Sequence, residues 1–394
     1  MSGEKPHSIW TRTFALLCLA QFLGYGQHSI LTPTFPLYIT QLGGSPFVVG
    51  LVLGCFAVTS VIIRPLIGHW ADRWSEAGVM VSGLAFLGAS VLLCFLPFVE
   101  TTMLANGLRG IGWAGLNAGG YSLLALTAPE ARRGEASGYY SGVQGSATIL
   151  FPAVALWLIY APFGGFTVVF AVAVALALVG AAVGALMARH APRPERPARA
   201  DDSSAWWSEI FHFLERDIVL PSALLFCLNL SLPSVTSFIV LHAHEIGIEN
   251  FGVYFVVSGA TNLLARPLFG RASDKIGRGT SLAAGFALQV IALLLLVTAS
   301  SLTGVIVSGV LYMTGNATAS SATLALAVER ANPQRRGKAM ASFSVAYPLS
   351  YGVGSLLTGS AVDIVGYVWT YLFLAGLGAS GVLLTLANWS RLKS

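Results

Sequence analysis

One arginine in the middle of an apolar stretch has the most informative chemistry of any residue in this chain. Arg109 lies within residues 102–127, roughly 10 Å from the nearer end of that stretch if it is a helix rising 1.5 Å per residue. Asn106, Trp113 and Asn117 stand at helical spacing from it, so the four side chains form one stripe. A charged guanidinium at this depth needs polar surroundings. We expect Arg109 to bind a ligand or to take part in coupling; the alternative is a structural arginine bonded to backbone carbonyls.

Other apolar stretches carry polar or aromatic residues that are spaced to face the same cavity. Gln21, Tyr25 and His28 lie one helical turn apart within residues 13–39. Candidates on further stretches are Gln144, Asn316 and Tyr347. Together these residues predict a pocket lined by amide and aromatic groups.

His28 is the best candidate for a proton carrier. All 17 Asp and Glu residues lie outside the middle of the apolar stretches, so no buried carboxylate is available for this role. An imidazole has an unperturbed pKa of ~6.5, so modest changes in its surroundings switch its charge near neutral pH. The alternative is a histidine that is only hydrogen-bonded between helices.

No pattern in the sequence indicates catalysis or a bound cofactor. A Gly-x-x-x-x-Gly-Lys-(Ser/Thr) loop, which would cradle the phosphates of ATP, is absent. No catalytic constellation occurs either, so we predict that the chain is not an enzyme. His242, His244 and Glu245 cluster without a further identifiable ligand, so we expect an exposed loop rather than a metal site.

The composition places most of the chain in a bilayer. Of its 394 residues, 55% are hydrophobic and 10% are charged, whereas a soluble protein carries about 25% charged residues. Apolar runs long enough to span ~30 Å of hydrocarbon favour helices over the alternating strands of a barrel. Candidate spans lie at residues 13–39, 47–66, 79–98, 102–127, 137–160, 165–188, 218–241, 250–265, 280–299, 302–328, 339–361 and 366–388. The predicted fold class is an all-α membrane protein with twelve transmembrane helices.

The basic residues predict the orientation. Every Lys and Arg except Arg109 falls in alternate connections or in the tails. The connections without any are those near 40–46, 99–101, 161–164, 242–249, 300–301 and 362–365. By the positive-inside rule both termini are cytoplasmic, and the net charge of +5 reflects topology rather than a nucleic acid partner.

The chain divides into two similar halves. Residues 189–217 form the one long polar segment, which we interpret as a cytoplasmic linker ending in a short amphipathic helix. It separates an N-terminal six-helix half, residues 1–188, from a C-terminal half, residues 218–394. Residues 64–73 read RPLIGHWADR and residues 266–275 read RPLFGRASDK, in matching places of the two halves. This repeat predicts a binding site between the halves near mid-membrane.

These repeated loops resemble the major facilitator superfamily, and the resemblance covers essentially the whole chain. The family pattern is Gly-x-x-x-Asp-(Arg/Lys)-x-Gly-Arg-(Arg/Lys). The second copy matches it through Gly270, Asp274, Lys275 and Arg278, and the first copy matches its first half through Gly68, Asp72 and Arg73. The resemblance implies a cytoplasmic gate, in which the glycines let another helix approach and the aspartates pair across the halves. The first copy then departs from the pattern, and a Gly-Pro-x-x-Gly-Gly run typical of proton antiporters is absent from residues 137–160.

The resemblance implies a secondary transporter in the bacterial inner membrane. Length, span count and loop pattern are similar to the drug and sugar efflux branch, so we predict proton-coupled efflux of a small organic molecule by a monomer. Uptake or facilitated diffusion remains an alternative, because the antiporter run and a buried acid are missing. A membrane sensor that does not transport is a further alternative, although such a protein would not need a gate motif in both halves.

Overall fold

The computed structural model describes residues 9–129, 132–190, 218–248, 251–331 and 336–392. Helices account for nearly all of these ranges, and no strand occurs in them. The first group of helices is α1 (Arg12–Gln41), α2 (Pro46–Ile62), α3 (Arg64–Arg73), α4 (Glu76–Val91), the 3-10 helix η1 (Leu92–Phe95), α5 (Val99–Thr127), α6 (Arg133–Tyr160) and α7 (Phe166–Ala188). The second group is α9 (Val219–Asn229), α10 (Leu232–Thr236), α11 (Ile239–Glu245), α12 (Gly252–Ile276), α13 (Arg278–Thr298), α14 (Leu302–Arg330), α15 (Arg336–Ala387) and α16 (Trp389–Leu392).

These helices make twelve crossings, and each predicted span coincides with one of them. By length and hydropathy alone, seven described helices could cross a membrane, or eight if α2 and α3 count as one span bent by 44°. Three more, α5, α12 and α14, fall short because polar residues interrupt their apolar runs. The last crossing is hidden in α15, which changes direction at Gly366, where φ is 76°. That conformation suits glycine, which has no Cβ to clash with the backbone.

Local sequence sets where the spans begin and where they break. The hydroxyl groups of Thr11, Ser75 and Ser301 accept a hydrogen bond from the first turn of α1, α4 and α14, and so satisfy a donor that has no partner within the helix. The seventh span is broken into α9, α10 and α11 around Leu230 and Ser237. A broken helix is tolerated within a membrane only where neighbouring groups bond the freed backbone or side chains.

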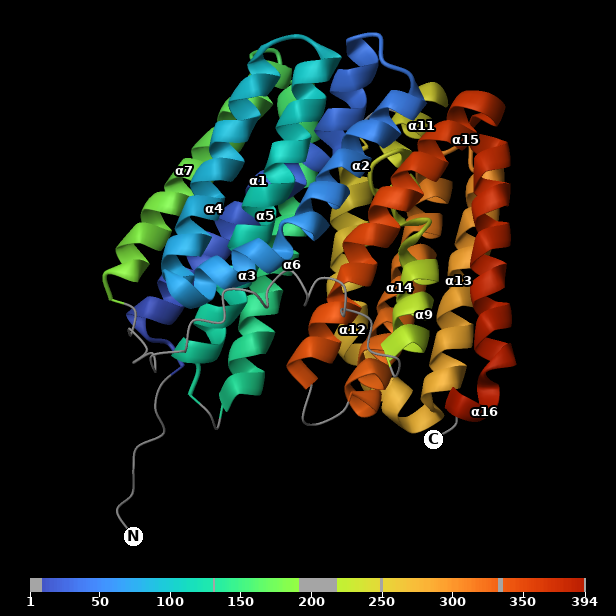
Figure 1. Ribbon diagram of the computed structural model, residues 1–394. Helices are drawn as coiled ribbons and strands as arrows, with labels where there is room; N and C mark the ends of the chain where they lie inside the picture. The colour runs from blue at the N-terminus through green and yellow to red at the C-terminus, as the bar shows by residue number, and fades with distance from the viewer. Residues whose placement is uncertain (1–8, 130–131, 191–217, 249–250, 332–335, 393–394) are drawn as a thin grey trace.

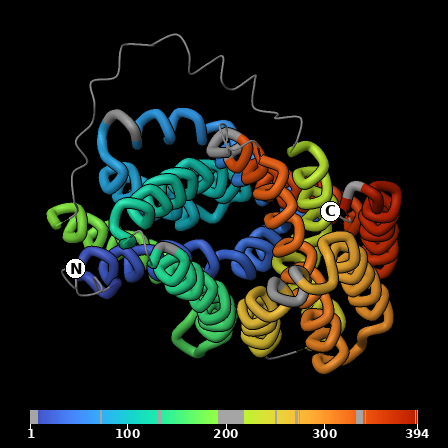
Figure 2. The backbone as a smooth tube through the Cα atoms, turned by 90° about the horizontal axis from the view of Figure 1, so that it is seen from below, coloured from blue at the N-terminus to red at the C-terminus, as the bar shows by residue number. Residues whose placement is uncertain are grey.

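The two groups of helices form two bundles that lie side by side (Figure 1). α1 begins and α16 ends at the same end of the molecule, here called the terminal end, and the other end is called the opposite end. Seen from the terminal end, α2 lies against α15 and α6 lies against α12 (Figure 2). These two helix pairs form most of the contact between the bundles.

The contact between α2 and α15 is tightest toward the opposite end. A Cβ atom at Gly50 would lie 2.6 Å from the backbone oxygen of Ser355, and one at Gly359 would lie 2.4 Å from that of Pro46. Only glycine allows the two backbones to come this close. Nearby, the Ser45 hydroxyl donates to the Asp363 carboxylate at 3.1 Å. The bundles are therefore closed at this end.

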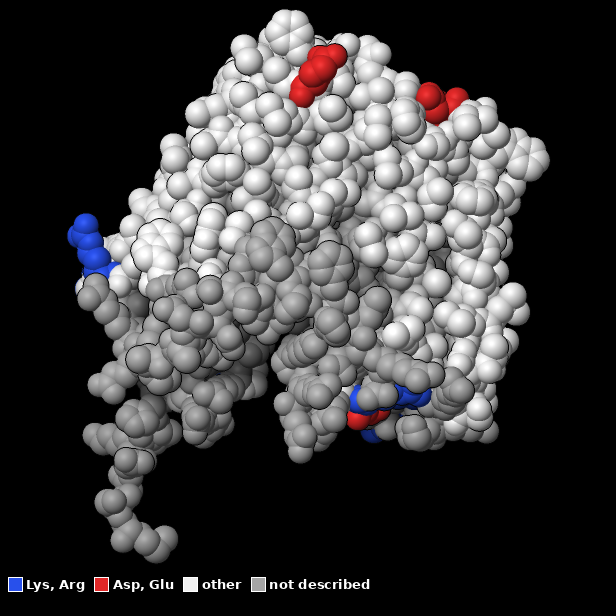
Figure 3. Space-filling view, viewed as in Figure 1, with Lys and Arg blue, Asp and Glu red and all other residues white. Residues whose placement is uncertain are grey.

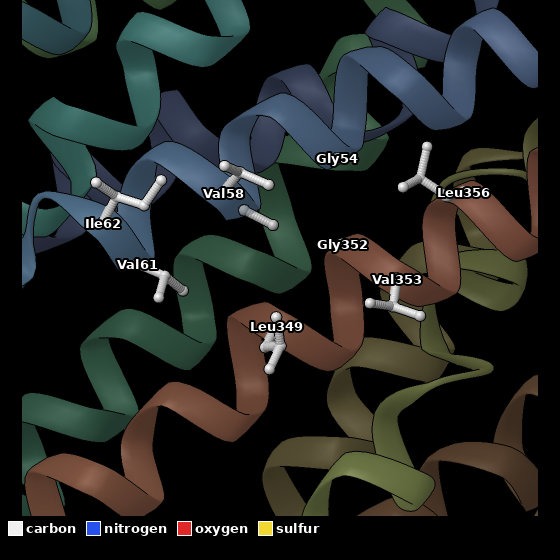
Figure 4. A pocket seen from close by; sticks show the side chains of 9 residues that line it. Gly54, Val58, Val61, Ile62, Leu349, Gly352, Val353 and Leu356 are labelled. Carbon is white, nitrogen blue, oxygen red and sulfur yellow. The ribbon is translucent and has the colours of Figure 1, made fainter. Parts of the chain in front are cut away.

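Toward the terminal end the same helices separate. An apolar pocket of about 180 Å³ lies between Val58, Val61 and Ile62 of α2 and Leu349 and Val353 of α15 (Figure 4). On α6, Cβ atoms at Gly138 and Gly142 would meet no atom within 4 Å, whereas one at Gly259 of α12 would touch Ile149 of α6. The described contact between α2 and α15 is thus looser at this pocket than at the opposite end.

The surface agrees with a chain that crosses a membrane. On the face shown in Figure 3, the described charged side chains lie at the rim of the molecule, and the described side chains between them carry no charge. Large apolar side chains are exposed on many helices, for example Trp157 of α6, Leu264 of α12 and Ile291 of α13. In water such a surface would be unfavourable, so it is the surface that lipid covers.

Candidate functional site

Arg109 of α5 lies at the centre of a buried polar cluster in the N-terminal bundle. Its Nη1 donates to the Asn106 Oδ1 at 2.5 Å, and its Nη2 lies 3.3 Å from the His28 Nδ1 of α1. Asn106 is itself held by α2, because its amide nitrogen donates to the Val52 carbonyl at 2.8 Å. A guanidinium can only donate, so the His28 Nδ1 must act as the acceptor and the ring proton must sit on Nε2. The cluster therefore joins α1, α2 and α5 through one cation.

Aromatic rings surround this cluster. The guanidinium carbon of Arg109 lies 5.2 Å from the ring centre of Phe35 and 5.5 Å from that of Phe56. The His28 ring stacks on Trp113 with centres 4.2 Å apart and planes inclined by 25°. His28 and Trp113 are only partly buried, whereas Arg109 is 2% exposed. A ligand that reaches the cluster would thus meet the histidine and tryptophan rings first.

The other predicted residues of the N-terminal bundle continue the stripe toward the terminal end. The Tyr25 hydroxyl donates to the Asn117 Oδ1 at 2.8 Å, and its ring lies 4.7 Å from Trp113. Gln144 of α6 donates to the Gln21 Oε1 at 3.1 Å. Gln21 is fully buried and also donates to the Leu116 carbonyl at 3.3 Å, so these two glutamines tie helices together inside the bundle.

The C-terminal bundle has a neutral counterpart. Asn316 of α14 donates to the Asn229 Oδ1 of α9 at 3.2 Å, and both residues are buried. The Tyr312 hydroxyl lies 2.7 Å from the Ser231 hydroxyl, at the first break of the seventh span. Further along, the Tyr351 hydroxyl lies 2.8 Å from that of Ser237, at the second break. Sequence reasoning did not identify this role for the tyrosines, because the breaks in residues 218–241 carry no strong signal.

Tyr347 and Asn316 do not join the Arg109 cluster. Tyr347 lies on α15 and is 49% exposed. Asn316 faces α9 within its own bundle. The structure thus brings His28, Asn106, Arg109 and Trp113 together, with Tyr25 and Asn117 beside them, and leaves the predicted residues of α14 and α15 on the facing bundle.

The gate motif can be followed only in part. The side chains of Asp72, Arg73, Gly270 and Asp274 lie outside the described residues. Lys275 is exposed, and Arg278 forms an ion pair with Glu329 at 2.8 Å within the C-terminal bundle. A Cβ at Gly68 would meet no atom within 4 Å, so in this conformation no helix packs against it and its gate role stays a prediction.

A bond between the bundles at the terminal end was missed by the sequence reasoning. Arg64, the first residue of α3, donates to the carbonyl and the hydroxyl of Ser344 on α15, at 3.2 and 2.9 Å. Its counterpart in the repeat, Arg266, instead donates to Asn262 of its own helix at 3.1 Å. The arginine that opens both repeated decapeptides was the available signal.

The predicted exposed loop at His242 is wrong. This residue belongs to α11 and is buried, with its ring 4.9 Å from Tyr367 and 5.2 Å from Tyr371. The seventh span continues to Glu245 because it is broken into short segments, so it needs more residues than a straight helix to cross. His244 and Glu245 are exposed, and the described residues form no cluster that could hold a metal ion.

Known proteins resemble the chain over its length or in part. An uncharacterized transporter of the MFS type from Methanocaldococcus jannaschii is 24% identical over 93% of both chains. Multidrug resistance protein 1 of Bacillus subtilis is 30% identical, but the match covers 38% of each chain. Quinolone resistance protein NorA of Staphylococcus aureus is 27% identical over 34% of each chain. The similarity to drug efflux proteins is thus distant and partial.

Solved structures share the fold. A POT family transporter has a TM-score of 0.79 at 13% identity, with 97% of both chains covered. A bacterial homologue of the lysosomal transporter Spinster, described as inward-facing and unoccupied, has a TM-score of 0.76 at 16% identity, with 97% of this chain and 96% of that one covered. At these identities the likeness shows the fold alone.

The family model called Major Facilitator Superfamily matches residues 17–260 and, in a second match, residues 219–391. Together these matches cover nearly the whole chain, and the second begins where the C-terminal bundle begins. This agrees with the twelve crossings, the two bundles and the repeated decapeptides. The chain therefore belongs to the major facilitator superfamily of membrane transporters, and it is not an enzyme.

Proposed function

We propose that this chain is a proton-coupled secondary transporter that exports a small organic molecule by alternating access between its two bundles. The observation that carries the proposal is the Arg109–His28 contact at mid-depth of the N-terminal bundle. A buried cation and a titratable ring in hydrogen-bond distance give one site that responds to both a ligand and a proton.

Alternating access is supported by the uneven contact between the bundles. The close approach at Gly50 and Gly359 closes the opposite end, and the separation of α2 and α15 at Val61 and Leu349 loosens the terminal end. If one bundle rocks against the other, the opposite end would open and the terminal end would close, with the cluster between them. The motif side chains near Asp72 and Asp274 would stabilise closure of the terminal end.

The proposed orientation rests on the basic residues. If the positive-inside rule holds, the terminal end faces the cytoplasm, and the pocket between α2 and α15 lies toward that side. We place the protein as a monomer in the inner membrane of a bacterium. Residues 189–217 would connect its two six-helix halves on the cytoplasmic side; this segment lies largely outside the described residues.

His28 is proposed to link protons to the substrate. When Nδ1 is protonated it can no longer accept from Arg109, and two positive charges then face each other. Among the described groups, Arg109 is the charged residue that interacts with this ring. Protonation therefore disrupts the cluster that the substrate uses, which is the physical requirement for coupling.

Export is taken from the relatives, and the geometry favours a second candidate. The efflux proteins named above match about a third of the chain and support export. In the cluster, however, a negatively charged substrate would relieve the repulsion between Arg109 and a protonated His28. Such a substrate and a proton would then bind together and travel in the same direction, which under an inward proton gradient means uptake.

The test is simultaneous measurement of substrate and proton movement in proteoliposomes. A pH-sensitive dye inside the vesicles reports protons while a panel of labelled organic cations, anions and neutral compounds is screened for flux. Proton movement opposite to the substrate supports export by antiport, and movement in the same direction supports the uptake candidate. Flux without proton movement would contradict coupling, and binding without flux would contradict transport and favour a sensor.

A further inference from the structure

The guanidinium of Arg109 is a buried charge whose hydrogen bonds all end on neutral groups. Nη1 is bonded to Asn106 and Nη2 to His28, while Nε is buried without a hydrogen-bond partner. A guanidinium has five N–H donors in a fixed planar fork, so most of this one's donors remain unmatched. An arginine side chain that is 2% exposed cannot satisfy them with bulk water.

No carboxylate among the described side chains supplies the missing negative charge. None of the 17 Asp and Glu residues lies in the middle of a span. In the part of the chain that the structure describes, ion pairs such as Arg132 to Glu135 and Arg278 to Glu329 lie away from the cluster. A buried cation without a counter-charge is unfavourable, so the site is complementary to a ligand that brings the charge.

A purely structural role does not explain how Arg109 is held. A structural arginine inside a membrane would be expected to bond backbone carbonyls of neighbouring helices. Here both acceptors are side chains, and Asn106 is fixed in turn by the Val52 carbonyl. The guanidinium is thus positioned on one edge, and its remaining N–H groups stay unused.

The surroundings define the rest of the ligand. Phe35 and Phe56 flank the guanidinium, and the stacked rings of His28 and Trp113 form a flat, partly exposed border. Flat apolar rings pack well against such a border, and a carboxylate matches the arginine fork in geometry and charge. A cation would meet repulsion from Arg109 at the same place.

We propose that the substrate class is an organic anion with an aromatic body, bound with its carboxylate on Arg109 and its ring beside Trp113. This assignment deepens the transport proposal and rests on it, and it favours the second candidate direction, in which the proton accompanies the substrate. Asn106 positions the guanidinium, and His28 lies at the junction of ring and charge.

The test compares pairs of probes that share a shape and differ in charge. Binding of 2-naphthoate and 2-naphthamide, and of benzoate and benzamide, is measured by thermal stabilisation and by calorimetry on the full chain in nanodiscs. We expect each carboxylate to bind about tenfold or more tightly than its amide, since a charge-assisted pair exceeds a neutral hydrogen bond by at least that factor. Equal binding within both pairs, or no binding of either carboxylate, would overturn the assignment.

Variants of Arg109 test whether this residue provides the charge that binds the carboxylate. A second substitution at the same position keeps the test decisive if the first variant misfolds. Arg109→Gln is expected to lose the preference for the carboxylate, Arg109→Lys to keep part of it, and Arg132→Gln, at an exposed ion pair, to keep all of it. If Arg109→Gln fails to fold, the Arg109→Lys variant still decides, because carboxylate binding unchanged from the parent chain would contradict an arginine fork. These measurements need no flux, so binding that is found without transport would contradict the proposed function and leave the ligand class standing.

Discussion

The first and fourth spans of the N-terminal bundle can be compared with the seventh and tenth spans of the C-terminal bundle. In both bundles a side-chain contact joins the two spans, His28 to Arg109 in one and Asn229 to Asn316 in the other. The first contact contains a permanent charge and a titratable ring, whereas the second contains two neutral amides. The two contacts thus join corresponding spans with different chemistry; at the repeat offset of 202 residues the counterpart of Arg109 lies beside Tyr312 and not at Asn316.

The difference suggests that the two bundles have different roles in the response to protons and ligands. In the proposed scheme, the N-terminal contact changes its hydrogen bonds when a proton or an anion binds, because His28 can lose its role as an acceptor. The C-terminal contact cannot respond in this way, since amides and hydroxyls do not titrate near neutral pH. Tyr312 and Tyr351 bond the breaks of the seventh span, so in the proposed scheme the C-terminal bundle is the part that does not respond to the proton.

The largest effect is expected at Arg109. Arg109→Gln removes the cation and should lower uptake or export of the best substrate by about 100-fold, because a hydrogen bond to a charged group is worth ~1.5–3 kcal/mol and more than one is involved. Flux in proteoliposomes checks this, with Arg132→Gln as the control. Flux within a few fold of the parent chain in a folded Arg109→Gln variant would show that the charged contact has no functional role.

The next effect concerns the energy source rather than the substrate. His28→Gln keeps a hydrogen-bonding side chain of similar length but cannot be protonated. Accumulation driven by a pH gradient should fall by about tenfold or more, while exchange of labelled for unlabelled substrate across the membrane continues. His190→Gln, at an exposed helix end, is the matched control. Unchanged pH-driven accumulation would mean that His28 does not couple protons to transport. The two bundles would then not differ in their response to protons.

Sequence reasoning located the spans and the faces of the polar stripes, but not their partners. The positions of Asn106, Arg109 and Trp113 follow from helical spacing, so the stripe could be predicted from α5 alone. The contact between Arg109 and His28 depends on how α1 and α5 are rotated against each other, and spacing carries no information on that rotation. Likewise, Gln21 shares its helix with His28, yet it bonds α5 and α6 inside the bundle.

The same limit applies at His242 and Arg64. His242 was assigned to a loop because an unbroken helix would have ended before it, and breaks within an apolar span lengthen the segment without changing its composition. Arg64 and Arg266 begin identical tripeptides, yet Arg64 bonds across the bundles and Arg266 within its own helix. A repeat in sequence thus predicts equivalent places but not equivalent contacts.

A third prediction tests whether α2 and α15 contribute equally to the close contact between the bundles. Gly50→Leu and Gly359→Leu each place a side chain where the backbones of α2 and α15 touch, and overpacking of this kind costs ~1–3 kcal/mol. Each should shift the population about tenfold or more toward opening at the opposite end. Labelling of a cysteine introduced near Ser45 measures this, and Gly138→Leu, where a Cβ meets open space, is the control. A shift caused by one glycine variant but not by the other would mean that the two bundles also contribute unequally to the contact between α2 and α15.

The smallest effect is expected at the neutral contact. Asn316→Ala removes the hydrogen bond to Asn229, and such bonds between membrane helices are worth ~0.6 kcal/mol on average, so apparent substrate affinity should change by about threefold. The pH dependence of transport should stay that of the parent chain, because no titratable group is removed. Asn388→Ala, which removes an amide that bonds within its own helix near the C-terminus, is the control. A changed pH dependence in Asn316→Ala would mean that the C-terminal contact also senses the proton, and the division between a responsive bundle and a fixed one would fail.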